Sequence, residues 1–398
     1  MLDTFHIKTI EDVEIKNVRV LLRVDFNVSL TSTHKIANDL RIKQSIPTIK
    51  KLLLDNNKII IISHLGQPDG RDEKYSLTPI FEDLRKLLPG TVINLIDDFR
   101  TEKNKVFLDQ QQGGEIVLLE NIRFYKEEKK NDEDFAEELA ALADVYVNDA
   151  FGVCHRVDAS IVSIPKFIPH FAGLLLAHEI TAINTMVNHP KHPLVALVGG
   201  AKVSTKINFL KSLIDHVDAL IIGGALANTF LCAQGKEIGK SLVELDKITN
   251  AKSILEYADE KEKKVLLPKD VVVFNSLTDD SGRVVSVDNV AEHDVICDIG
   301  PESEALFDEV IAHAHTIIWN GPFGKVEDER FARGTDFLYY AITQNKEALS
   351  LVGGGDTIAA ISHHEYLDRI THISAGGGAM MEFIERGTLP GIDALQTE

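Results

Sequence analysis

The chain has 398 residues and a formal net charge of −19, with 44% hydrophobic and 26% charged residues. This composition is typical of a globular protein, and the length predicts at least two domains. The excess of acidic residues argues against nucleic acid as a partner, so an anionic ligand would need a local basic pocket.

No segment of the sequence is typical of secretion or of a membrane span. The first stretch, MLDTFHIKTIEDVEIKNV, is charged throughout, and the longest apolar stretch, 219–233, is interrupted by two glycines and an asparagine. The three cysteines, Cys154, Cys232 and Cys297, lie far apart and form neither a metal-ligand pattern nor a disulfide framework. We therefore expect a cytoplasmic protein that does not contact a membrane.

Short apolar runs alternate with amphipathic segments in the first half of the chain. The runs predict strands at 19–24, 58–63, 115–120 and 144–148. They are continuously apolar, as parallel strands covered by helices on both faces are. The segment 131–143 has helical periodicity, and the charged run 126–134 is predicted to be a solvated loop that leads into this helix.

A predicted helix at 172–188 divides the chain. We expect a first lobe at 1–172, a joining helix at 173–190 and a second lobe at 191–388. Further strands are predicted at 193–200, 219–224, 264–268, 316–321 and 349–355, with a helix at 206–218 after the first of them. The pattern predicts an α/β fold with two doubly wound, Rossmann-like parallel sheets.

Polar and basic side chains follow the predicted strands of the first half. Ligands of open α/β sheets bind beyond the carboxyl ends of the strands. The residues at these ends are Asp25, Phe26, Asn27, His64, Leu65, Gly66, Gln67, Asn121, Arg123, Asn148, Asp149, His155 and Arg156. Arg41 stands at a predicted helix start. Since guanidinium groups match phosphate and carboxylate oxygens, the set predicts an anion pocket, although each residue alone is as compatible with a loop cap or a surface ion pair.

Glycines follow the predicted strands of the second half. Gly-Gly pairs end the strands at 193–200 and 219–224, and a Gly-Pro turn follows Asn320. Glycine turns that open a helix present backbone N–H groups to phosphate, whereas a single Gly-Gly pair is more typical of a tight turn or of close helix–sheet packing. Lys202 and Lys206 are four residues apart and are predicted to share one face of a helix start beside a polyphosphate.

Asp356 raises a separate question, because it directly follows the three glycines of LVGGGDTIAAI. A carboxylate would repel a phosphate, but Mg²⁺ binds one or two carboxylates together with phosphate oxygens. Asp356 is therefore a candidate metal ligand, and Thr357 could donate its hydroxyl to a phosphate. Simple N-capping of the following helix is the alternative for both residues.

Two other functions remain as alternatives at this point. The chain contains no GxxxxGK[ST] sequence, and GGGDTI lacks the third glycine of a G-x-G-x-x-G turn, which disfavours an NAD-dependent dehydrogenase. A non-catalytic binding protein is disfavoured by the basic residues Arg41, Lys202 and Lys206 together with Asp356.

The ordered motifs resemble those of the phosphoglycerate kinase family along nearly the whole chain. They are RVDFNV, SHLGQP, LLENIRFYKEE, DVYVNDAFGVCHR, GGAKVSTKI, IIGGALANTFL, DIGPES, WNGPFGKVE, VGGGDTIAAI and SAGGGA followed by LPGIDAL. The resemblance implies reversible, Mg²⁺-dependent phosphoryl transfer between 1,3-bisphosphoglycerate and ADP, giving 3-phosphoglycerate and ATP. It also implies a monomer with two lobes, a hinge-bending cleft, and a C-terminal tail at about 389–398 that returns to the first lobe.

The resemblance assigns roles to matching positions. It implies that phosphoglycerate binds to Asp25, Phe26, Asn27, Arg41, His64, Leu65, Gly66, Gln67, Arg123 and Arg156. It implies that the nucleotide binds to Gly200, Ala201, Lys202, Lys206, Gly224, Gly300, Asn320, Pro322, Glu327, Gly353, Gly354, Gly355, Asp356 and Thr357. Glu327 is expected at the ribose, Asp356 at the magnesium ion, and Arg41, Lys202 and Lys206 at the transferring phosphoryl group.

The chain departs from the family pattern at several positions. Gln67 replaces an arginine, which removes one guanidinium from the expected phosphoglycerate pocket, and Lys325 takes a usually apolar position near the nucleotide. Ala375, Val153 and Thr205 also differ from the usual residues. None of these changes removes the expected reactive groups.

Overall fold

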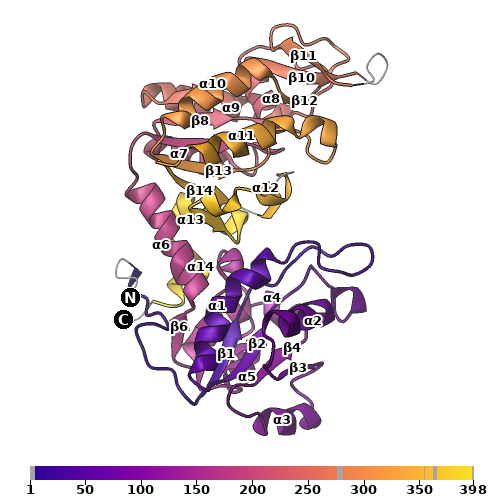
Figure 1. Ribbon diagram of the computed structural model, residues 1–398, viewed down its shortest axis with the longest axis vertical. Helices are drawn as coiled ribbons and strands as arrows, with labels where there is room; N and C mark the ends of the chain where they lie inside the picture. The colour runs from indigo at the N-terminus through magenta and orange to yellow at the C-terminus, as the bar shows by residue number, and fades with distance from the viewer. Residues whose placement is uncertain (1–4, 276–280, 354, 362–364, 397–398) are drawn as a thin grey trace. The chain divides into compact units, whose positions relative to one another are not determined.

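The structure is a computed structural model (Figure 1) that describes residues 5–275, 281–353, 355–361 and 365–396, with the side chain of Asp356 excepted. The chain forms two compact units, of which the first comprises Met1–Thr181 with Thr388–Glu398 and the second Ala182–Gly387. The division falls within helix α6 (Leu174–Asn188). The lobe limits expected from the sequence remain a prediction.

A parallel six-stranded sheet forms the centre of the first unit. Its strands lie in the order β3 (Ile93–Ile96), β4 (Ile116–Leu119), β2 (Lys58–Ile62), β1 (Arg19–Arg23), β5 (Val145–Asn148) and β6 (His170–Ala172). The helices of this unit are α1 (Leu40–Leu54), α2 (Thr78–Leu87), α3 (Glu102–Asp109), α4 (Lys126–Lys129), α5 (Glu133–Ala140), the start of α6, and α14 (Pro390–Asp393).

The central strand β1 has buried residues on both faces. Val20 and Leu22 belong to one hydrophobic core together with Ile42 and Ile49 of α1. Because successive side chains of a strand point to opposite faces, Arg23 does not face this core. Arg23 is nevertheless fully buried. A buried guanidinium needs hydrogen-bond partners, and these lie at the candidate site.

The second unit contains another parallel six-stranded sheet. Its strands lie in the order β15 (His372–Ser374), β14 (Leu349–Gly353), β13 (Thr316–Asn320), β7 (Leu194–Val198), β8 (Ala219–Ile222) and β9 (Lys264–Leu266). The helices are α7 (Ile207–His216), α8 (Gly224–Ala233), α9 (Ile248–Glu260), α10 (Pro301–Ala312), α11 (Arg333–Gln344), α12 (Gly355–Ala359) and α13 (Gly377–Arg386). The expected α/β class with two parallel sheets is confirmed.

A separate antiparallel sheet in the second unit was not predicted. It consists of β11 (Arg283–Ser286), β10 (Asp270–Phe274) and β12 (Val295–Ile299). These runs were not selected from the sequence, although only β12 is interrupted by an acidic residue, Asp298. The short strands β3, β6 and β15 were also missed.

Two local predictions were wrong. Helix α7 begins at Ile207, so Lys206 is its N-cap residue and Lys202 lies before the helix; the two lysines do not share a helix face. The charged run 126–134 is also not a solvated loop throughout, because residues Lys126–Lys129 form the short helix α4. Glu128 in this helix is fully buried.

The start of α6 is held by a buried carboxylate. Asp149 is fully buried, and its Oδ1 accepts hydrogen bonds from the backbone N–H groups of Leu175 and Leu176, at 2.9 and 3.2 Å. A Cβ at Gly173 would lie 2.1 Å from this Oδ1, so only glycine allows the approach. Burial raises the pKa of Asp149 to about 7, although the helix N–H groups act in the opposite direction.

We expect Asp149→Asn to stabilise the protein increasingly as the pH rises from 4 to 7. The pKa of Asp149 is raised in the folded state, so the wild type loses stability as the pH rises from the unfolded value of 3.8 to about 7. Each pH unit in this window costs about 1.4 kcal/mol, which makes about 4 kcal/mol the upper bound. Urea unfolding of both proteins at pH 4 to 8 measures the difference. A difference that does not vary with pH would contradict the assignment.

Candidate functional site

The carboxyl ends of β1 and β2 bring together the polar residues of the first expected site. Arg41 at the start of α1 donates from Nη1 to the Asp25 carboxylate at 3.0 Å and to the Asn27 carbonyl at 2.9 Å. The Asn27 side chain in turn accepts a hydrogen bond from the backbone N–H of Gly66 at 2.8 Å. Asp25 is nearly fully buried, so its ion pair with Arg41 fixes the guanidinium at the strand ends.

Arg123 joins the same cluster from the end of β4. Its Nη1 donates to the Gly66 carbonyl at 2.9 Å, and its Nη2 lies 3.3 Å from the Asp158 carboxylate. Gly66 has a φ of +63°, and a Cβ at this position would lie 2.4 Å from the ring of Tyr75. The loop after β2 therefore requires glycine to bring its backbone between Asn27 and Arg123.

His64 lies at the centre of the cluster and is fully buried. Its pKa is far below the usual value because burial and the nearby guanidinium groups of Arg23, Arg123, Arg41 and Arg156 disfavour the charged imidazolium. The ring is therefore neutral at physiological pH. Its Nε2 is buried and has no hydrogen-bond partner among the described residues, as is expected of a group that awaits a ligand.

The remaining residues predicted for phosphoglycerate differ in what they can offer. The side chains of Phe26 and Leu65 are part of the hydrophobic core, so only their backbone could contact a ligand. Gln67 is exposed on the loop after Gly66. Arg156 is half-buried, and its Nε makes no hydrogen bond within the described part of the chain.

Arg23 belongs to this cluster, although sequence reasoning did not select it. Its Nη2 lies 3.3 Å from His64 Nδ1. The signal was present, because Arg23 is the one basic residue inside the apolar stretch VLLRV. A cation in a strand that is buried on both faces is costly unless it is paired, and is therefore a candidate for function.

Glycine turns at three strand ends form the second expected site. The backbone N–H of Gly199 donates to the Asn320 carbonyl at 2.9 Å and that of Gly200 to the Pro322 carbonyl at 2.8 Å. Gly224 has a φ of +63°, and a Cβ on it would lie 2.7 Å from the Gly200 nitrogen. The ends of β7, β8 and β13 therefore meet with backbone against backbone, which no larger residue permits.

Lys206 and Asn320 are brought together at these turns. The Lys206 ammonium, which is nearly buried, donates to the Gly199 carbonyl and to the Asn320 side-chain oxygen, both at 2.7 Å. The cluster continues to the end of β14, where the Thr357 hydroxyl donates to the Gly353 carbonyl at 2.6 Å and accepts from the Gly321 N–H at 2.9 Å. The four expected nucleotide residues Lys206, Asn320, Gly353 and Thr357 thus lie in one hydrogen-bonded group.

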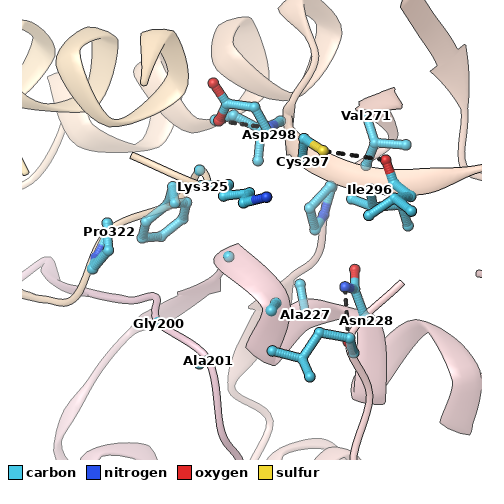
Figure 2. A pocket seen from close by; sticks show the side chains of 18 of the residues that line it. Gly200, Ala201, Ala227, Asn228, Val271, Ile296, Cys297, Asp298, Pro322 and Lys325 are labelled. Atoms are coloured by element: carbon cyan, nitrogen blue, oxygen red, sulfur yellow. Dashed lines mark hydrogen bonds between the residues drawn. The ribbon is translucent and has the colours of Figure 1, made fainter. Parts of the chain in front are cut away.

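A cavity of about 570 Å³ adjoins the glycine turns. Five of the residues predicted for the nucleotide line it: Gly200, Ala201, Gly224, Pro322 and Glu327. Figure 2 shows Gly200 and Pro322 at one side, Asn228 of α8 at the other, and the side chain of Lys325 between them. Most of the remaining lining is apolar and comes from α8 and the unpredicted antiparallel sheet, including Leu231, Val271 and Ile296. An apolar pocket beside a glycine turn is suited to a base with its phosphates.

Other predicted nucleotide residues lie elsewhere or cannot be placed. Lys202 is exposed and does not line the cavity, and neither does Gly300. Gly300 is the N-cap of α10, where Asp270 accepts hydrogen bonds from the helix N–H groups. Gly355 begins the short helix α12. Gly354 and the side chain of Asp356 lie outside the described residues. Among the residues that the structure describes, no group of three or more histidine, cysteine or acidic side chains is arranged to hold a metal ion.

Comparisons with a family model, with curated proteins and with solved structures all find similarity to phosphoglycerate kinases. Residues 10–387 match the family described as "Phosphoglycerate kinase". The chain is 45% identical over 390 residues to a phosphoglycerate kinase of Pelotomaculum thermopropionicum, with 98% of both proteins covered. It is 42% identical to the protein named "Phosphoglycerate kinase 3, cytosolic" of Arabidopsis thaliana, with 97% of both covered. The solved phosphoglycerate kinase from Coxiella burnetii is 39% identical, with a TM-score of 0.85 and 98% of both chains covered.

We expect Gly224→Ala to abolish binding of ATP with Mg²⁺, because the new Cβ would collide with the backbone of the turn after β7. Gly235→Ala is the matched control: Gly235 has a φ of +79° but open space around its Cβ position. The control should cost only the backbone strain of about 1–2 kcal/mol. Calorimetric titration and thermal unfolding of both variants distinguish the two effects. Equal nucleotide affinities of the two variants would contradict the close-approach argument.

Proposed function

Because the chain belongs to the phosphoglycerate kinase family, we propose that it transfers a phosphoryl group reversibly between 1,3-bisphosphoglycerate and ADP, forming 3-phosphoglycerate and ATP, as a step of glycolysis and gluconeogenesis. The observation that carries this proposal is the similarity of the whole chain to phosphoglycerate kinases, at 45% identity over 98% of both proteins. The arrangement of the two strand-end sites supports it independently.

Phosphoglycerate binds to the first unit in this proposal. The ligand carries a carboxylate and a phosphate, and the cluster around His64 holds the guanidinium groups of Arg41, Arg123 and Arg156. Guanidinium groups make charge-assisted and often bidentate bonds to such oxygens. The neutral His64 adds an uncharged contact at Nε2. Gln67 is expected to contribute less than an arginine would, since its amide is neutral.

The nucleotide binds to the second unit. The apolar part of the cavity takes the base, Glu327 contacts the ribose, and the backbone N–H groups of the glycine turns receive the phosphates. Lys206 lies where the phosphate chain would reach the end of β13, since its ammonium already contacts Asn320. The exposed Lys202 would reach the phosphates from outside the turn.

Mg²⁺ is expected to accompany the nucleotide, with Asp356 as its protein ligand. Asp356 lies in α12 between Gly355 and Thr357, and the Thr357 hydroxyl belongs to the hydrogen-bonded group around Gly353. One hard oxygen ligand beside the phosphates is what Mg²⁺ requires when most of its ligands are water and phosphate oxygens. When bound, the ion would neutralise phosphate charge during transfer.

The protein's own contribution to the reaction is to position the substrates and to stabilise charge. In-line phosphoryl transfer needs no covalent intermediate with the enzyme. Arg41 and Lys206 are the residues proposed to bind the transferring group, one from each unit, so catalysis requires that the units bring their ligands together and exclude water from the acyl phosphate.

We propose that the enzyme acts as a monomer in the cytoplasm on small-molecule substrates, without a nucleic-acid or membrane partner. The net charge of −19 supports the last part of this proposal, because it disfavours association with nucleic acids and other polyanions. Of the helices in the described residues, none combines the length and the apolar character that a membrane crossing requires.

The proposal is tested by a coupled assay with ATP, Mg²⁺ and 3-phosphoglycerate. We expect formation of ADP that depends on 3-phosphoglycerate and on Mg²⁺. Omission of each reactant provides the control, and a chelator should stop the reaction. ATP consumption that does not respond to 3-phosphoglycerate would refute the proposed function.

Arg41→Ala should lower kcat by about 10²-fold or more with a smaller change in either KM, because the guanidinium is proposed to bind charge that develops in the transition state. Arg386→Ala is the control: this arginine forms an exposed i,i+4 ion pair with Glu382 on α13. Steady-state kinetics give both constants, and thermal unfolding shows whether the fold survives. A variant with normal kcat and a raised KM would assign Arg41 to ground-state binding alone.

A further inference from the structure

Glu128 is a buried acid whose contacts lead toward the first site. It lies in α4 and is fully buried. Its Oε1 accepts from the Ser160 hydroxyl at 2.5 Å, and its Oε2 accepts from the Ser160 backbone N–H at 2.9 Å. A carboxylate that is held on both oxygens by one residue fixes that residue in a single geometry.

Ser160 passes this constraint on to Arg23. The Ser160 hydroxyl, whose proton is directed at Glu128, accepts a hydrogen bond from Arg23 Nε at 2.9 Å. The Ser160 carbonyl is also held, since it accepts from the Tyr146 hydroxyl at 2.6 Å. Each of these side chains is fully buried, so water does not compete for the contacts.

Arg23 is oriented by all three of its nitrogens. Nε donates to Ser160, Nη1 to the carbonyl of Val24, and Nη2 faces His64 Nδ1 at 3.3 Å. A guanidinium group has donors and no acceptor. His64 Nδ1 must therefore accept, which places the proton of the neutral ring on Nε2.

If Arg23 were not in this position, the tautomer of His64 with its proton on Nδ1 would have a hydrogen-bond acceptor in Asp25. The Asp25 carboxylate lies 3.8 Å from the same Nδ1. An ionised carboxylate accepts hydrogen bonds and cannot donate one, so it favours a proton on Nδ1. The two neighbours of Nδ1 thus favour opposite proton positions. Arg23 is closer to Nδ1 than Asp25 is, and Ser160 and Glu128 keep it there.

We propose that Glu128 and Ser160 are positioning residues of the phosphoglycerate site: they hold Arg23 so that the proton of the His64 ring lies on Nε2, ready to donate to an oxygen of the ligand. The proposal rests on the proposed function only in naming phosphoglycerate as that ligand. The charged groups that surround His64 are Arg23, Arg41, Arg123, Arg156 and Asp25. Beyond them, Glu128 faces Arg23, and Asp158 faces Arg123.

Burial and the four guanidinium groups lower the pKa of His64, so the ring is neutral and carries one proton, on either Nδ1 or Nε2. The contacts from Glu128 through Ser160 to Arg23, here called the relay, then decide which ring nitrogen carries this single proton. With the proton on Nε2, the buried unpaired nitrogen is a donor, which complements carboxylate and phosphate oxygens. With the proton on Nδ1, Nε2 would be an acceptor and would repel those oxygens.

The contacts from Glu128 through Ser160 to Arg23 also have a purely structural interpretation, because buried polar and charged groups are costly unless they are hydrogen-bonded. The test therefore needs a readout at His64. The nitrogen chemical shifts of the ring distinguish the two tautomers, and they can be measured in protein labelled with ¹⁵N-histidine and free of ligand. The signal of His64 is assigned by its absence in His64→Gln.

Ser160→Ala is the principal variant, because it removes the link between Glu128 and Arg23 and leaves both charges in place. Ser163→Ala is the matched control. Ser163 lies in the same π-helical turn (Ala159–Ser163) and is also fully buried, but its hydroxyl donates to Asn131 at 2.8 Å. Glu128→Gln is the second variant, which removes the charge and keeps an acceptor for Ser160.

We expect the wild type and Ser163→Ala to have an unprotonated Nδ1 and a protonated Nε2. In Ser160→Ala and Glu128→Gln, the shifts should move toward the other tautomer, and KM for 3-phosphoglycerate should rise about fivefold, as loss of one hydrogen bond of about 1 kcal/mol implies. KM for ATP should not change. Should one variant fail to fold, the other provides the same two readouts.

A wild-type His64 with its proton on Nδ1 would overturn the proposal, as would Ser160→Ala with unchanged ring shifts and unchanged KM. The ring shifts are measured without substrate, so they are independent of the proposed function. If the wild type has the expected tautomer and the variants change it, but 3-phosphoglycerate neither binds nor reacts, the relay stands and the proposed function fails.

Discussion

Parallel pairing of strands determines where this chain can place its chemistry. In a parallel sheet all carboxyl ends lie at one edge, and residues that are far apart in sequence meet there. Asp25, His64 and Arg123 follow β1, β2 and β4, which lie side by side in the first unit. Gly200, Gly224 and Asn320 mark the ends of β7, β8 and β13, which are neighbours in the second. Both proposed sites depend on this constraint.

The two edges use different chemistry for anions. The first presents guanidinium groups, of which those of Arg23, Arg41 and Arg123 are fixed by neighbours, whereas the second presents backbone N–H groups and one nearly buried lysine, Lys206. Side-chain forks suit a small ligand with two separate anionic groups, and backbone turns suit a chain of phosphates that passes close to the main chain. If both sites bind as proposed, the difference accounts for glycine at Gly200 and Gly224 and for arginine at Arg41 and Arg123.

The sequence predicted the parallel sheets and which candidate residues follow their strands, because apolar runs and the residues after them are local signals. It failed where the deciding contact is distant in sequence. Glu128 lies in a charged run, which predicted an exposed side chain, but it is fully buried and hydrogen-bonded to Ser160, 32 residues later. Lys202 and Lys206 have helical spacing, but the close approach of Gly199 and Gly200 to the β13 turn delays the helix until Ile207.

The cavity lining illustrates the same limit. The glycines of the turns were found from the sequence, whereas most of the apolar wall was not, since Val271 and Ile296 belong to the antiparallel sheet that was not predicted. Its strands carry the acids Asp270 and Asp298 near their ends. One of these acids, Asp298, has a structural use: its carboxylate accepts from the N–H groups of Ile299 and Gly334, at 2.8 Å each. Burial raises its pKa to about 7. An acid in an apolar run can thus mark a buried strand end, and only the tertiary contacts show it.

The first site also shows how an acidic chain can keep several guanidinium groups close together without a ligand. Arg41 is paired with Asp25, Arg123 with Asp158, and Arg23 reaches Glu128 through Ser160. Each carboxylate contacts its arginine directly or through Ser160 and so offsets the repulsion between the cations. The orientation of the donors is therefore established before an anion binds, and binding does not have to supply the energy of assembling them. In this arrangement the acids of the pocket would serve the proposed anion site, because they hold in place the cations that are proposed to bind the ligand.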